Sequence, residues 1–130
     1  MAKKKINKDK VIKNVIAKFK SKEYDTFLAK IKGHDKPFRI EYKGINKGFT
    51  PDLIAMNGDS ATIFDLLPKL LKSELQENFQ KWILFNDYAQ KSGGEFIVLS
   101  ANDIKDDVKK MLDAKKINAT IQSLDDFQDQ

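Results

Sequence analysis

The chain has 130 residues, of which 41% are hydrophobic and 33% are charged, with a formal net charge of +5. These totals are ordinary for one folded domain and too small for two. Because the sequence has no cysteine and one histidine, it excludes disulfides and thiolate metal sites and argues against a His-based metal cluster or a Ser-His-Asp triad. Catalysis would have to use carboxylates, lysines and a metal ion. No apolar run approaches the roughly 20 residues of a membrane span, so we expect a cytoplasmic protein with no membrane association.

Charge is unevenly distributed along the chain. Residues 1–50 carry fifteen basic and five acidic side chains, whereas residues 51–130 carry nine basic and fourteen acidic ones. A basic first half favours binding to nucleic acid or to an acidic protein. The alternative is that the lysines form a solvated tail and the exposed side of a helix.

Residues 7–32 have the apolar spacing of a long amphipathic helix that ends at Gly33. Glu23 interrupts its apolar series, so we expect this acid to point toward the body of the protein; the alternative is an acid at the margin of the face, paired with a nearby lysine. The lysines between the apolar positions are candidates for binding nucleic acid: Lys13, Lys18, Lys20 and Lys22.

The middle of the chain predicts three strands. Residues 38–42 alternate apolar and charged side chains, and residues 52–56 and 60–67 are β-prone runs joined through Asn57-Gly58, a dipeptide typical of tight hairpins. Pro68 ends the last of these strands.

The remaining sequence predicts a helix over residues 70–90, a buried strand over 95–99, a helix opened by a Ser100–Asp103 capping box, and a strand over 117–121. Residues 1–6 would be a disordered lysine-rich start and residues 123–130 a loose acidic tail. The order αβββαβαβ predicts a single three-layer α/β domain over residues 1–122. Its mixed sheet, with an antiparallel hairpin and parallel crossovers, would be flanked by helices.

Two acids are candidates for a metal site. Alternation along residues 60–67 places Asp65 between apolar neighbours on a covered strand, where an unpartnered carboxylate is costly. Asp52 begins the neighbouring hairpin strand, close enough for the two acids to converge. Such a pair of hard oxygen ligands suits Mg²⁺, which could polarise a phosphodiester and activate water.

The segment Pro51-Asp52, a Gly-containing turn and Ile63-Phe64-Asp65-Leu66-Leu67 resembles the PD-(D/E)XK nuclease superfamily, also called restriction-endonuclease-like. The predicted element order resembles its αβββαβ core over residues 7–122. The resemblance implies a Mg²⁺- or Mn²⁺-dependent nuclease in which Asp52 and Asp65 bind the metal with the backbone carbonyl of Leu66. It also implies that Glu23 would be the helix-borne acid, and that Gln80 or Lys81 would face the site from the second long helix.

This sequence departs from the family pattern at Leu67, where active members usually have a lysine. An ammonium there helps to orient and deprotonate the attacking water and offsets phosphate charge, and leucine can do neither. Lys69 lies two residues further along the same alternation, beyond Pro68. Lys72 or Lys81 could instead reach the site from the helix, as a migrated lysine does in some family members.

The leading hypothesis is therefore a nuclease-fold protein that binds nucleic acid, with an atypical or lost phosphodiesterase site. The alternative is a non-catalytic module that binds nucleic acid or an acidic protein through the basic N-terminal helix. A third possibility is a protein–protein or homodimer contact through the helix that carries Trp82.

Overall fold

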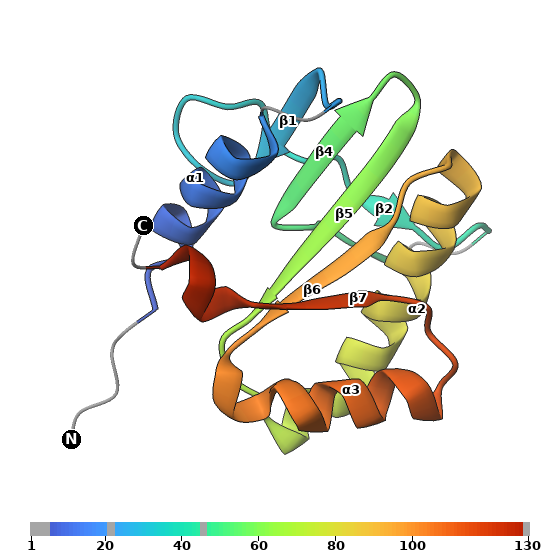
Figure 1. The fold of residues 1–130 in the computed structure, drawn as a ribbon. Helices are drawn as coiled ribbons and strands as arrows, with labels where there is room; N and C mark the ends of the chain where they lie inside the picture. Colours follow the sequence, from blue (N-terminus) through green and yellow to red (C-terminus); the bar gives the residue numbers. More distant parts are fainter. Residues whose placement is uncertain (1–5, 21–22, 45–46, 129–130) are drawn as a thin grey trace.

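The computed structural model describes residues 6–20, 23–44 and 47–128. Its centre is a five-stranded mixed sheet in the order β1-β4-β5-β6-β7 (Figure 1). Neighbouring strands are antiparallel from β1 to β5 and parallel from β5 to β7, so the predicted hairpin and parallel crossovers are confirmed. The strands are β1 (Thr26–Ala29), β4 (Leu53–Asn57), β5 (Ser60–Leu67), β6 (Phe96–Ser100) and β7 (Thr120–Ser123).

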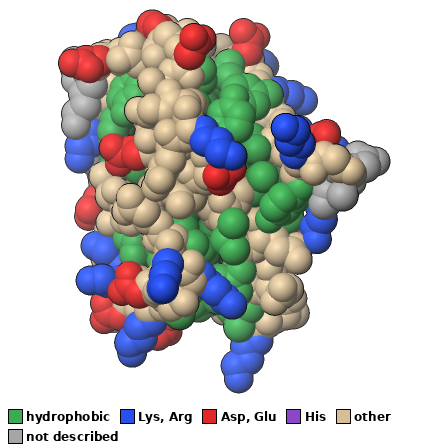
Figure 2. Space-filling view, turned by 90° about the vertical axis from the view of Figure 1, so that its right-hand side faces the viewer, with side chains coloured by type: hydrophobic (Ala, Val, Ile, Leu, Met, Phe, Trp, Pro, Cys, Tyr) green, Lys and Arg blue, Asp and Glu red, His purple; other side chains and the backbone are tan. Residues whose placement is uncertain are grey.

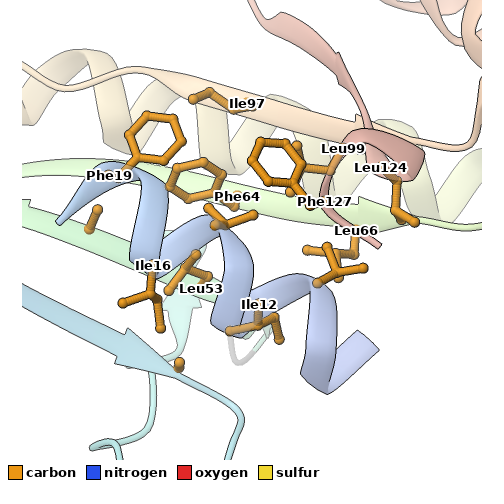
Figure 3. Close-up of a cluster of buried hydrophobic side chains, with 14 of the residues drawn as sticks. Ile12, Ile16, Phe19, Leu53, Phe64, Leu66, Ile97, Leu99, Leu124 and Phe127 are labelled. Carbon is orange, nitrogen blue, oxygen red and sulfur yellow. The ribbon is translucent and has the colours of Figure 1, made fainter. Parts of the chain in front are cut away.

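Helices cover both faces of this sheet, as predicted. On one face, α1 (Lys8–Phe19) and the short η3 (Leu124–Phe127) enclose a core around Phe64 (Figure 3). On the other face, α2 (Leu75–Ser92) and α3 (Lys105–Ala114) enclose a second core around Trp82 and Phe85. Short 3-10 turns, η1 (Lys72–Glu74) and η2 (Asn102–Ile104), precede α2 and α3. None of the helices in the described residues is long and apolar enough to cross a membrane.

The predicted first helix is too long. It ends at Phe19, and Thr26–Ala29 pairs with β4 as the edge strand β1. Because Phe27 and Leu28 continue the three- and four-residue apolar spacing, the pattern alone extends the helix through a segment that the sheet recruits. The predicted strand at residues 38–42 contributes only β2 (Ile40–Glu41), which pairs with β3 (Gly48–Phe49) in a separate two-stranded sheet.

Both predicted loose ends need correction where the structure describes them. Residues 1–5 lie outside the described residues, but Ile6 packs against the α1-side core. The predicted acidic tail at 123–130 is wrong as far as residue 128: Leu124 and Phe127 are 0% and 1% exposed. Burial of these two apolar side chains outweighs the acidic composition around them. The expected Ser100 cap is also absent, because Ser100 ends β6 and the side chain caps neither η2 nor α3.

Close contact between the end of α2 and β5 fixes the helix on the sheet. Gly93 ends α2 with a φ of 88°, a left-handed conformation that favours glycine. A Cβ atom on the next residue, Gly94, would lie 2.0 Å from the carbonyl oxygen of Ala61. The two glycines therefore allow the end of α2 to pack closely against β5. This close packing keeps the side chains of α2 over Asp65.

Candidate functional site

Asp52 and Asp65 come together at the start of β4 and near the end of β5. The antiparallel register pairs Leu53 with Phe64, so one further step sets Asp52 opposite Asp65. The Oδ2 atom of Asp52 accepts a hydrogen bond of 2.9 Å from the backbone N–H of Leu66. This geometry places the two acids at neighbouring positions of adjacent strands.

The backbone carbonyl of Leu66 also lies on the Asp52 side of β5. Within a strand the N–H and C=O of one residue point the same way, and the Leu66 N–H points to Asp52. Continued register sets Leu66 opposite Pro51, which has no N–H to donate. The ladder therefore supplies no donor to the Leu66 carbonyl at this position, which leaves its oxygen suited to a metal ligand.

Asp65 points toward α2, where two consecutive residues hold its carboxylate. Lys81 Nζ lies 3.2 Å from Asp65 Oδ2, and Trp82 Nε1 donates a 2.8 Å hydrogen bond to the same oxygen. The side chain of Asp65 is only 4% exposed and that of Lys81 21%. Of the lysines considered in the sequence analysis, Lys81 therefore places an ammonium beside Asp65 from the helix.

Leu67, where the family resemblance would lead one to expect a lysine, is a buried core residue. It shares the face of β5 with Asp65, but its side chain is buried in the α2-side core. A buried ammonium at that position would lose hydration in apolar surroundings. Leu67 therefore serves the packing of the α2-side core, and the ammonium beside Asp65 comes from Lys81 on α2.

The electrostatics of the pair are set mainly by burial. Burial raises the pKa of Asp65 above its ordinary value of 3.8; Lys81 opposes that rise, the neighbouring Asp52 carboxylate adds to it, and the Trp82 hydrogen bond opposes it. Asp52 is more open, with its side chain 14% exposed, and Lys30 Nζ lies 3.7 Å from its Oδ1 atom. Each carboxylate therefore has its own lysine, one from α2 and one from the segment after β1.

Three other predicted site residues do not reach the acids. Glu23 is exposed in the turn after α1 and lines a hollow beside Asn57 and Gly94, at the opposite end of the hairpin. The expectation that it faces the site from the first helix is wrong, because the helix ends before it. Lys69 is exposed beyond the end of β5, and Lys72 is exposed in η1.

Gln80 also faces away from the acid pair. Its side-chain oxygen accepts a 2.6 Å hydrogen bond from Lys47 Nζ, and its backbone carbonyl accepts one of 2.7 Å from the Tyr42 hydroxyl. These bonds join α2 to the small β2–β3 sheet. Of the two alternatives from the helix, Gln80 and Lys81, only Lys81 contacts Asp65 among the interactions of the described residues.

The predicted nucleic-acid-binding lysines of the first helix lie elsewhere. Lys13, Lys18 and Lys20 are exposed, but α1 covers the sheet face opposite to that of Asp65. Lys18 lies over the Phe127 ring, 5.2 Å from its centre. Lys22 falls outside the described residues. The structure therefore does not bring the described lysines of this set to the acid pair.

The sequence did not single out Lys30, which contacts Asp52, or the basic residues that line a hollow together with it. The segment after β1 lines a hollow with Lys30, Lys32, His34, Lys36 and Arg39. Arg39 also lines a second hollow with Lys47 and Gln80. The high density of basic residues between positions 30 and 39 could have indicated this surface. It was not used because the first of these residues were assigned to the predicted helix over residues 7–32.

Trp82 is fully buried, so its side chain cannot anchor a partner as one hypothesis required. The face over α2 and β2 instead carries a band of other apolar side chains with Lys and Arg around it (Figure 2). It includes Phe38, Ile83 and Tyr88, which are 36%, 45% and 39% exposed.

The donor set fits a hard divalent cation with few protein ligands. No group of three or more His, Asp or Glu side chains that could hold a metal occurs within residues 6–20, 23–44 and 47–128. Two carboxylates and one carbonyl remain, and Mg²⁺ is often held by one or two carboxylates together with waters and substrate phosphates. No family model matches the chain, and no curated protein matches it.

Proposed function

We propose that the chain is a divalent-metal-dependent phosphodiesterase of the PD-(D/E)XK type that cleaves nucleic acid. The observation that carries the proposal is the 3.2 Å contact between Lys81 Nζ and Asp65 Oδ2. It supplies an ammonium beside the second acid although Leu67 occupies the motif position. The order of helices and strands and the mixed sheet support the same family.

Each residue has a distinct task in this proposal. Asp52, Asp65 and the Leu66 carbonyl would hold Mg²⁺ or Mn²⁺, which, when bound, polarises the phosphodiester and lowers the pKa of water. Lys81 orients the attacking water and offsets the negative charge that grows on the phosphate. Water adds to phosphorus, one P–O ester bond breaks, and a proton passes to the departing oxygen. Trp82 is a positioning residue, because its N–H fixes the Asp65 carboxylate.

The test is cleavage of end-labelled single- and double-stranded DNA and RNA with Mg²⁺ or Mn²⁺. Lys81→Met should lower the rate about 100-fold or more, in line with the loss of one charge-stabilising group, and Asp65→Asn should do the same. Lys91→Met is the matched control, because Lys91 lies on the same helix in an exposed ion pair with Asp87. Its rate should stay within about twofold of the wild type. Metal-independent degradation, or equal rates for the Lys81 and Lys91 variants, would overturn the proposal.

A second candidate is a non-catalytic nucleic-acid-binding module. It is favoured by the burial of Asp65, whose Oδ2 atom already receives both Lys81 and Trp82, an arrangement that also serves as a structural ion pair. This candidate predicts that nucleic acid binds but is not cleaved with either metal, and that Asp52→Asn leaves binding unchanged. Metal-dependent cleavage lost in the Asp65→Asn variant would exclude it.

A further inference from the structure

Two hollows that share the Arg39 side chain are lined by basic residues, one of which, Lys30, contacts Asp52. The first is lined by the segment after β1, and the second lies between the β2–β3 sheet and the start of α2. Arg39 lines both, so the hollows adjoin at this side chain. We call them together the basic groove; its cationic residues are Lys30, Lys32, Lys36, Arg39 and Lys47, and His34 also lines it.

The basic groove comes close to Asp52 through Lys30. Lys30 lines the first hollow, and its Nζ atom lies 3.0 Å from the Thr50 carbonyl oxygen and 3.7 Å from Asp52 Oδ1. Phe49 lines the second hollow, three residues before Asp52. Thr50 lines the first hollow, so the chain segment that leads to Asp52 contributes to the lining of both hollows.

The cations along the groove are accessible for a further anion. Lys32, Lys36 and Arg39 are exposed, and Arg39 forms a surface ion pair with the half-exposed Glu41. Such a surface ion pair contributes little and is easily exchanged for a phosphate contact. The acidic residues lining the groove are Asp9 and Glu77, fewer than its five lysine and arginine side chains.

We infer that the basic groove binds the phosphate backbone of nucleic acid and leads it past Asp52 and Asp65. The inference rests on the proposed function for its ligand and goes beyond it in assigning the binding surface. It replaces α1, whose lysines lie across the sheet from Asp65. Lys30 links the basic groove to the acid pair, because it lines the groove and its ammonium contacts Asp52.

The test is binding of a labelled 20-nucleotide DNA, single-stranded or duplex, measured by fluorescence anisotropy in EDTA so that metal-dependent cleavage cannot occur. The groove variant is Lys32→Ala/Lys36→Ala/Arg39→Ala, and the matched control is Lys10→Ala/Lys13→Ala/Lys20→Ala on α1, which removes the same charge. The groove variant should bind at least about tenfold more weakly and show a salt slope smaller by two to three, about one for each lost phosphate contact. The α1 variant should stay within about threefold of the wild type.

Several results would overturn the groove: equal weakening by both triple variants, no weakening by the groove variant, or competition by polyglutamate as strong as by DNA at equal charge. Thermal unfolding of both variants confirms folding, because all six side chains are exposed. The two proposals fail separately. Groove-dependent binding without cleavage by the wild type would sink the phosphodiesterase and keep the groove. Undiminished cleavage by the groove variant at subsaturating DNA would sink the groove alone.

Discussion

Lys81→Met isolates the ion pair at the centre of the site. The substitution keeps an unbranched side chain of similar length while it removes the ammonium 3.2 Å from Asp65 Oδ2. At that distance and an effective dielectric constant of about 20, the attraction between the charges is about 5 kcal/mol before desolvation is counted. Loss of one partner from a buried ion pair costs about 3–5 kcal/mol.

Two features of the site reduce this cost. Lys81 is 21% exposed, so part of its charge is screened by solvent, and the Trp82 N–H still stabilises the carboxylate. We therefore expect Lys81→Met to lower the free energy of unfolding by about 2–4 kcal/mol at pH 8. The loss should shrink as the pH falls from 8 toward 3.8, because the pKa of Asp65 is raised by burial above that value and its protonation removes the unpaired charge.

The assay is urea unfolding followed by fluorescence, for which the single, buried Trp82 is the probe. A double-mutant cycle with Asp65→Asn separates the energy of the ion pair from the packing energy of the Lys81 side chain. The Asp65→Asn/Lys81→Met variant should recover most of the free energy of unfolding that Lys81→Met loses. Lys91→Met should change the free energy of unfolding by less than about 0.5 kcal/mol. Equal losses at pH 8 and near pH 3.8, the ordinary pKa of the group, or additive effects in the cycle, would refute a buried, ionised pair.

Three further predictions concern the strand, the turn and the buried acid. Leu67→Lys should destabilise the protein by about 2–4 kcal/mol in urea unfolding, because it places an ammonium in the α2-side core; an unchanged midpoint would contradict that burial. Gly94→Ala should cost more than about 3 kcal/mol or prevent folding, since its Cβ would lie 2.0 Å from the Ala61 carbonyl oxygen, whereas a soluble variant with the wild-type melting temperature would exclude so close an approach. Because the native pKa of Asp65 is raised above 3.8, the stability that its proton confers is complete below pH 3.8 and is lost as pH rises through the native pKa. The Asp65→Asn variant should therefore gain stability relative to the wild type as pH rises from 4 to 8 in the same urea assay. A gain in its relative stability on acidification would contradict this prediction.

The sequence predicted the sheet best where a local signal and burial agree. The turn at Gly58 and the apolar run from Ile63 to Leu67 defined the β4–β5 hairpin, and Gly93 marked the end of α2. It failed at Thr26–Ala29, because a four-residue edge strand continues the apolar spacing of the preceding helix. Only pairing with β4, a long-range contact, decides between the two structures.

The candidate site shows the same division. Alternation along β5 was enough to predict that Asp65 is buried and partnered, and the register with Asp52 followed from the hairpin. The alternation could not predict which residue would be that partner, because Lys69, Lys72 and Lys81 all follow the strand closely in the sequence. The rotation of α2 on the sheet, fixed by tertiary packing, selects Lys81. The basic groove depends on a loop path that no periodicity encodes.

A crystal soaked in Mn²⁺ tests the central claim most directly, because anomalous scattering locates the ion without reference to activity. The account predicts a manganese peak between the carboxylates of Asp52 and Asp65, with the Leu66 carbonyl among its ligands and Lys81 beside a metal-bound water. Asp52→Asn crystals should lose the peak. Full data at saturating Mn²⁺ with no peak at this pair, and with Lys30 and Lys81 still on their carboxylates, would contradict it.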